Sequence, residues 1–141
     1  MNSIYTQQVS WQQARHELTA IREQVFVKEQ NVPLELELDE HDEHCYHLLA
    51  YGQEGQPVGT ARLLQDGHIG RMAVLAPYRG RGIGSKLLVS IVELARRQGL
   101  DEVYLNAQIH AVGFYEKHQF QVVGEEFMDA GIPHVQMQRR L

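Results

Sequence analysis

The chain has 141 residues, of which 43% are hydrophobic and 22% are charged, and its formal net charge at pH 7 is −5. This composition is ordinary for a globular domain, so it excludes a disordered, collagenous or coiled-coil protein. The single cysteine excludes a disulfide framework and a cysteine-based zinc finger, and the acidic balance argues against nucleic acid as a main partner, because such binding depends on neutralising phosphates.

The sequence also carries no membrane signal. No apolar run approaches the roughly 20 residues that span a bilayer. The first residues lack the basic and apolar segments of a signal peptide. We therefore expect a cytoplasmic protein without a membrane partner.

Charge is distributed unevenly along the chain. Residues 1–60 carry three basic and ten acidic side chains, whereas residues 61–141 carry ten basic and eight acidic ones. The acidic side chains concentrate in segment 35–43 and the basic ones in segment 79–86. The acidic segment suits a cationic ligand and the basic segment an anionic one. A run of carboxylates can also be a solvated loop without a ligand.

The first half of the chain predicts a strand, a helix and three more strands. Residues Tyr5–Val9 form the first strand, and Ser10, with Gln13 three residues later, begins a helix in the spacing of a capping box. Apolar residues continue the helical pattern until Pro33 ends it. Segment 31–43 is an acidic loop or a short helix. The antiparallel strands that follow are segments 45–51, 58–64 and 68–75.

The second half predicts alternating helices and strands. Apolar residues recur on one helical face from Ile83 to Ala95, and Gly99 ends this helix. A strand, a helix of this length and a returning strand imply a right-handed crossover with parallel pairing. The later elements are a strand at 103–105, a short helix at 111–118, and strands at 120–123 and 135–138. The order β-α-βββ-α-β-α-β-β predicts a mixed central sheet flanked by helices in one α/β domain over residues 1–141.

A glycine-rich loop lies between the third strand of the meander and the long helix. Gly80, Gly82 and Gly84 let backbone N–H groups approach a ligand, and the helix that follows presents its positive end. With Arg79, Arg81 and Lys86, this loop is suited to a phosphate or pyrophosphate. The spacing fits neither the Walker loop nor the dinucleotide fingerprint G-x-G-x-x-G.

The loop sequence resembles a known signature. Residues 79–84 read Arg-Gly-Arg-Gly-Ile-Gly and are similar to the R/Q-x-x-G-x-G/A motif of the GNAT superfamily of acetyl-CoA-dependent N-acetyltransferases. Segment 72–78 resembles the strand and proline-containing turn that precede this motif. Segments 21–33, 37–42 and 131–134 resemble the YjcF/ElaA-like branch. The resemblance covers nearly the whole chain and implies the GNAT fold.

The resemblance implies how acetyl-CoA binds as the cosubstrate. In this family the amides of the loop bind the pyrophosphate of CoA. The residues that match this loop here are Arg79, Gly80, Arg81, Gly82, Ile83, Gly84 and Ser85. The preceding strand bonds the pantetheine arm through Met72, Ala73 and Val74. Asn106 is expected to end the next strand, where the parallel pair splays; it either bonds the pantetheine or merely ends the strand.

The resemblance also implies that Tyr115 is the general acid. An amine attacks the thioester carbonyl, so the leaving thiolate needs a proton, and a neutral phenol is a competent donor at pH 7. A backbone N–H such as that of Val74 can stabilise the oxyanion. The alternative is that Tyr115 only packs on its helix.

The general base is less defined. An alkylamine must lose a proton before it attacks, and the candidates are Glu29, His47, His110 and His134. His134 leads through the resemblance alone, and a relay of water molecules is an equal alternative.

The resemblance implies that the acceptor lies across the sheet from the cofactor. The residues on this side are Arg22, Phe26, Glu29 and Arg71, together with acidic segment 35–43. Carboxylates attract a cationic amine, whereas Arg22 or Arg71 can instead hold a carboxylate or phosphate of the acceptor. Small amines, amino sugars, peptides and protein lysines all stay open as acceptors.

A metal site is not expected. The candidate ligands are irregularly spaced, and no second cluster accompanies them; they are Asp39, His41, Asp42, His44, Cys45 and His47.

The sequence therefore predicts an N-acetyltransferase that moves an acetyl group directly from acetyl-CoA to a primary amine. The alternative is a non-catalytic acyl-CoA-binding sensor or scaffold. The loop is expected to contact CoA and not the acyl group. A donor that carries an acyl group other than acetyl is therefore also an open alternative. A homodimer is common for this fold, but the sequence leaves the oligomeric state undetermined.

Overall fold

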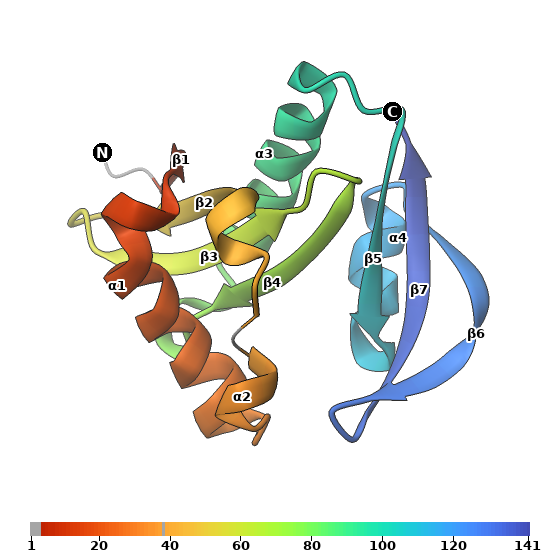
Figure 1. The fold of residues 1–141 in the computed structure, drawn as a ribbon, viewed down its shortest axis with the longest axis horizontal. Helices are drawn as coiled ribbons and strands as arrows, with labels where there is room; N and C mark the ends of the chain where they lie inside the picture. Colours follow the sequence, from red (N-terminus) through yellow and green to blue (C-terminus); the bar gives the residue numbers. More distant parts are fainter. Residues whose placement is uncertain (1–3, 38) are drawn as a thin grey trace.

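The computed structural model describes residues 4–37 and 39–141, and in this part of the chain the strands form one seven-stranded sheet (Figure 1). The strand order is β1-β2-β3-β4-β5-β7-β6. The strands are β1 (Tyr5–Val9), β2 (Tyr46–Tyr51), β3 (Pro57–Leu63), β4 (His68–Val74), β5 (Glu102–Gln108), β6 (Gln121–Asp129) and β7 (Ile132–Arg140). The helices are α1 (Trp11–Arg22), α2 (Leu34–Glu37), α3 (Ile83–Arg97) and α4 (Val112–Lys117). The predicted α/β class with a mixed sheet is confirmed.

The sheet opens between β4 and β5. These are the parallel neighbours among the described strands, and they pair only at His68↔Tyr104 and Ile69↔Leu105. Beyond this point β4 stays paired with β3, whereas β5 stays paired with β7 along its whole length. The two halves of the sheet therefore diverge as a V, which is visible as the separation of β4 from β5 in Figure 1.

A bulge in β4 lies where the separation begins. Its register with β3 shifts between the pairs Arg62↔Gly70 and Thr60↔Ala73, so β4 carries an extra residue there. Arg71 lies in this bulge and adopts a φ of +48°, a left-handed conformation that is costly for a residue with a Cβ. A bulge bends and twists its strand, which directs β4 away from β5.

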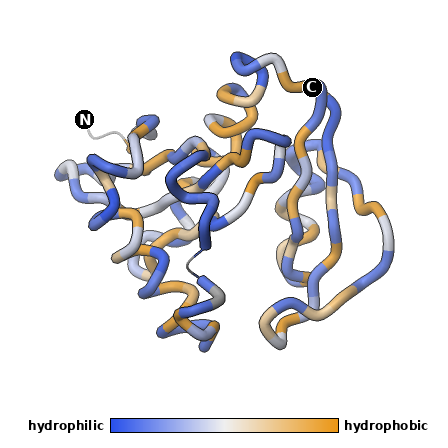
Figure 2. The backbone as a smooth tube through the Cα atoms, viewed as in Figure 1, coloured by the Kyte–Doolittle hydropathy of each residue, from blue (hydrophilic) through white to orange (hydrophobic). Residues whose placement is uncertain are grey.

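Helices cover both faces of the sheet. Leu48 and Ala50 of β2 belong to the core that contains α3, whereas Leu49 between them belongs to the core that contains α1. Because successive strand residues point to opposite faces, α1 and α3 lie on opposite sides of the sheet. Figure 2 shows hydrophobic residues along the strands and on α3, while the segment after α2 is strongly hydrophilic.

The predicted helix ends are confirmed. Ser10 caps α1 by accepting a hydrogen bond from the Gln13 backbone N–H at 3.2 Å. The helix continues through a π-helical segment, Glu23–Glu29, and stops before Pro33. Gly99 follows α3 with a φ of +81°, and the Leu100 N–H bonds back to Ala95.

The last strands are longer than predicted. β6 extends through mostly exposed residues, whereas β5 and β7 extend beyond their apolar centres through largely polar residues. Asn106 consequently lies within β5 and does not end it, which corrects the sequence expectation. None of the helices in the described part of the chain has the length and apolar character needed to cross a bilayer.

Candidate active site

A cavity of about 470 Å³ occupies the V between β4 and β5. On the β4 side it is lined by Gly70, Arg71, Met72, Ala73 and Val74. On the opposite side it is lined by residues of β5, α4 and β7, which include Leu105, Asn106, Tyr115 and His134. Phe26 and Glu37 close it on the face that carries α1 and α2. The cavity thus brings together most of the predicted pantetheine, catalytic and acceptor residues.

The glycine loop joins β4 to α3 and keeps an open surface. Gly80 and Gly82 have φ values of +78° and +80°, and a Cβ built on either would meet nothing within 4 Å. Gly82 caps α3 without a side-chain hydrogen bond, so the first N–H groups of the helix have no capping side chain. Positive φ, exposed backbone and a helix N-terminus together fit a pyrophosphate group of a CoA ligand.

The cations of this loop differ in their surroundings. Arg79 lines the cavity, donates to the Val74 carbonyl at 2.8 Å and pairs with Glu29 at 2.9 Å. Arg81 lies over the Tyr78 ring. Ser85 in the first turn of α3 lies 3.1 Å from His118 Nε2. Gly80 to Ser85 lie outside the cavity lining, as does Glu29, which the sequence placed with the acceptor.

Tyr115 extends from α4 into the cavity. Its ring packs edge-on against Phe114 and Phe120, and burial raises the pKa of its phenol to about 12. Among the described residues no hydrogen bond uses its hydroxyl, which remains available to a ligand in the cavity. The ring therefore packs on its neighbours and still presents a neutral O–H.

His134 lies on β7 across the cavity from β4. Its Nδ1 is 2.7 Å from the Ile132 carbonyl, and a carbonyl only accepts, so Nδ1 carries the proton. Nε2 is then an unprotonated acceptor when the ring is neutral. His110 also lines the cavity, where its Nε2 lies 2.8 Å from Gln108 Oε1. His47, by contrast, is buried away from the cavity lining.

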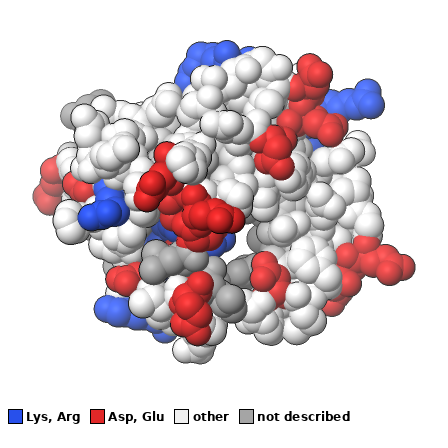
Figure 3. Space-filling model, in the orientation of Figure 1, with Lys and Arg blue, Asp and Glu red and all other residues white. Residues whose placement is uncertain are grey.

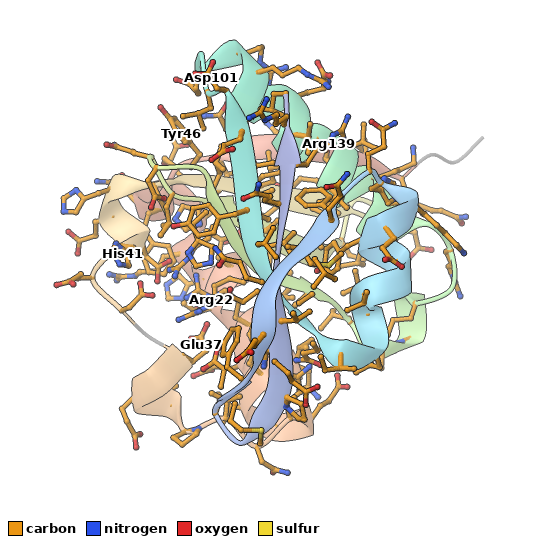
Figure 4. All side chains as sticks on the ribbon, turned by 90° about the vertical axis from the view of Figure 1, so that its right-hand side faces the viewer. Arg22, Glu37, His41, Tyr46, Asp101 and Arg139 are labelled. Atoms are coloured by element: carbon orange, nitrogen blue, oxygen red, sulfur yellow. The ribbon has the colours of Figure 1, made fainter. Side chains whose placement is uncertain are left out.

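An ion network lies under the acidic segment. Arg22 is fully buried, and its guanidinium donates to Glu37 Oε1 and to both carboxylate oxygens of Asp42, at 2.9 and 3.0 Å. It lies outside the cavity lining, so the structure corrects the sequence view of Arg22 as an acceptor contact. Figure 4 places the Arg22 and Glu37 side chains beside each other.

Two further arginines complete the network from β3 and β4. Arg62 donates to Asp39 at 2.6 Å and to Asp42 at 2.9 Å, and Arg71 donates to Asp39 at 3.1 Å and to the Glu37 carbonyl. Burial acts to raise the pKa of Asp42, but the hydrogen bonds and charges of Arg22 and Arg62 hold it below its ordinary value. Half of the carboxylates of segment 35–43 are therefore neutralised internally and are not a free acidic surface.

Asp42, Cys45 and His47 bring their ligand atoms within 4.8 Å of one another. Two arginines already use the Asp42 carboxylate, and His47 Nε2 donates to the Asp42 carbonyl at 2.8 Å. Burial raises the pKa of the Cys45 thiol to about 11, which opposes the thiolate that a metal needs. This chemistry does not suit a metal centre at this cluster.

Sequence reasoning missed two features of the site. Arg62 and His68 line the cavity although no motif singled them out. Glu37 was seen only as part of a charged run, and nothing in the sequence distinguishes it from its neighbours. A signal for Arg62 existed, because a charged residue in an otherwise apolar strand needs a buried partner.

Comparison with known proteins agrees with this geometry. The model of the acetyltransferase (GNAT) domain matches residues 5–141. The chain belongs to this family. Among GNAT relatives, YjcF of Bacillus subtilis, an uncharacterized N-acetyltransferase, is 44% identical over 123 residues, or 84% of this chain and 87% of YjcF. ElaA of Escherichia coli is 31% identical over 150 residues, or 94% and 97% of the two chains.

Solved GNAT structures superpose over nearly the whole chain. An acyl-CoA N-acyltransferase from Pseudomonas aeruginosa has a TM-score of 0.87 at 32% identity and covers 97% of this chain and 99% of its own. The crystal structure of Escherichia coli ElaA has a TM-score of 0.86 at 30% identity, with coverage of 95% and 98%. The predicted family and its YjcF/ElaA-like branch are confirmed, and the chain is an acyltransferase by family.

Proposed function

We propose that this GNAT domain transfers an acetyl group directly from acetyl-CoA to a primary amine. The observation that carries the proposal is the cavity between the splayed strands, which Met72 to Val74, Tyr115 and His134 all line. The open glycine loop at the start of α3 supports CoA binding, because its backbone fits a pyrophosphate.

The residues of the glycine loop and of the cavity indicate how CoA is bound. Loop residues Arg79 to Ser85 hold the pyrophosphate, and the unpaired edge of β4 at Met72, Ala73 and Val74 bonds the pantetheine arm. Asn106 faces the same cavity from β5 and bonds the arm from the other side. Acetyl-CoA supplies an acyl group activated as a thioester.

We assign the proton transfers to Tyr115 and His134, which line the cavity. Tyr115 O–H donates to the leaving sulfur, and its raised pKa keeps it protonated at neutral pH. His134 Nε2 accepts a proton from the acceptor nitrogen, directly or through water, because Nδ1 is committed to the Ile132 carbonyl. Phe26 and Arg71 border the acceptor.

A thiol-release assay with acetyl-CoA and a panel of amines tests the proposal. We expect turnover with at least one amine, and Tyr115→Phe should lower kcat by about 100-fold or more while leaving acetyl-CoA affinity within roughly threefold. Unchanged turnover in Tyr115→Phe would remove this residue from the mechanism. Tight CoA binding without turnover on any amine would favour a non-catalytic acyl-CoA-binding module.

A further inference from the structure

Glu37 is the one member of acidic segment 35–43, among its described side chains, that lines the cavity. It ends α2, on the face that carries α1, whereas the glycine loop begins α3 on the opposite face. In the space-filling view of the α1 face, acidic side chains gather around a central hollow (Figure 3). A ligand that entered here would meet Glu37 from the side opposite the CoA loop.

The Glu37 carboxylate is buried, and only one of its two oxygens has a hydrogen-bond partner. The residue is 2% exposed, and its Oε1 accepts from Arg22 Nε and lies 3.6 Å from Arg71 Nε. Its Oε2 is buried and has no hydrogen-bond partner. An unpaired buried carboxylate oxygen is costly, and a ligand that donates to it recovers that cost.

The position of Glu37 along the cleft matches the place of an acceptor. Arg71 donates to the Glu37 carbonyl at 2.9 Å, and Arg71 directly precedes the β4 residues that we assign to the pantetheine arm. Arg79, which begins the pyrophosphate loop, bonds instead to Val74 at the other end of β4. Glu37 therefore lies beyond the end of the pantetheine arm.

The charges of the cavity favour a cation over an anion. Each arginine that lines it already has a carboxylate partner: Arg62 and Arg71 pair with Asp39, and Arg79 pairs with Glu29. An anionic group on the acceptor would compete with these carboxylates. A cationic or N–H group would instead use the Glu37 oxygen that the protein leaves unpaired.

We infer that Glu37 is the specificity-determining residue for the acceptor, and that Oε2 binds the ammonium group of an alkylamine without a neighbouring carboxylate or phosphate. This inference rests on the proposed acetyl transfer to an amine. The bound ammonium gives up a proton to His134 Nε2, directly or through water, and the resulting neutral amine attacks the acyl carbon.

Binding to the CoA-saturated protein tests the inference without requiring turnover. The probes are cadaverine and lysine, which have the same chain and terminal amine but differ by the α-carboxylate of lysine. We expect cadaverine to bind more tightly than lysine in a calorimetric titration. Glu37→Gln keeps an acceptor for Arg22 but replaces the charged Oε2 by an uncharged amide nitrogen, and it should weaken cadaverine binding by roughly 10- to 100-fold.

A control variant isolates the effect of Oε2. Glu35→Gln removes an exposed charge from the same short helix. It should bind cadaverine within about threefold of wild type. A CoA titration of Glu37→Gln checks that its cofactor site is intact.

Three results would overturn the inference: no cadaverine binding by wild type, tighter binding of lysine, or equal cadaverine affinity in Glu37→Gln and wild type. The thiol-release assay separates this outcome from the proposed function. Binding that depends on Glu37 without acetyl transfer refutes the transferase proposal alone, whereas transfer that is unaffected in Glu37→Gln refutes the role of Glu37 alone.

Discussion

Replacing Arg22 by methionine tests the ion network that shapes the acceptor side of the cleft. Arg22 has no exposed surface, and it binds Asp42 with two hydrogen bonds and Glu37 with one to its side chain. Methionine fills part of the same volume but leaves both carboxylates without this partner. Removing one partner of a buried ion pair costs about 3–5 kcal/mol, because a charge is left buried and uncompensated.

The remaining arginines reduce this cost. Asp42 keeps Arg62 at 2.9 Å, whereas Glu37 keeps only the longer 3.6 Å contact to Arg71. We therefore expect Arg22→Met to lower the free energy of unfolding by about 3 kcal/mol, at the low end of that range. Arg22→Lys keeps the charge but loses the bidentate hydrogen bonds to Asp42, so it should lower the free energy of unfolding by about 1–2 kcal/mol.

Urea unfolding followed by far-ultraviolet circular dichroism measures both variants. A double-mutant cycle with Asp42→Asn should give a coupling energy of at least about 1 kcal/mol. The reasoning is refuted if Arg22→Met unfolds within about 0.5 kcal/mol of wild type, which is the range of a surface substitution. A raised acceptor KM without loss of stability would return Arg22 to the acceptor contacts.

Two further predictions concern the cofactor loop and acid stability. Gly82→Ala places a Cβ on a residue with a φ of +80°, which costs about 1–2 kcal/mol, and directs it into the open loop surface; calorimetry should show weaker CoA binding, and unchanged affinity would argue against a pyrophosphate at this loop. For Asp39 and Asp42, burial acts to raise the pKa, but their arginine partners hold it below the unfolded value near 4. Their stabilisation is therefore present above about pH 4 and is lost as the pH falls through the folded pKa values. Asp42→Asn should show a shallower loss of stability than wild type in urea unfolding between about pH 5 and pH 2; parallel slopes would contradict this origin.

Local patterns predicted the elements of the fold because local physics determines them. The Ser10 cap, the glycine after α3 and the apolar face of that helix each act within a few residues. The full lengths of β6 and β7 were not predictable, because β6 is mostly exposed and the pairing of both strands with their neighbours decides where they end. The Arg71 bulge likewise depends on the register between β3 and β4.

The cofactor side of the site was easier to predict than the acceptor side. A glycine loop before a helix is a contiguous signal, whereas the acceptor side depends on which charges face one another across the fold. Segment 35–43 looks uniformly acidic in sequence, but Asp39 and Asp42 pair with arginines 20 or more residues away. What separates these carboxylates from Glu37 is their hydrogen bonding, because the second oxygen of Glu37 is buried without a hydrogen-bond partner.

The central claim is that CoA binds in the V between β4 and β5 and along the loop before α3. The most direct measurement is a titration of isotopically labelled protein with CoA, followed by amide chemical shifts in heteronuclear NMR. We expect the largest shifts at Met72 to Val74, at Gly80 to Ser85 and at Asn106, with small shifts in β1 and in the first turns of α1. Saturable binding with its largest shifts elsewhere, or no binding at millimolar CoA, would contradict the account.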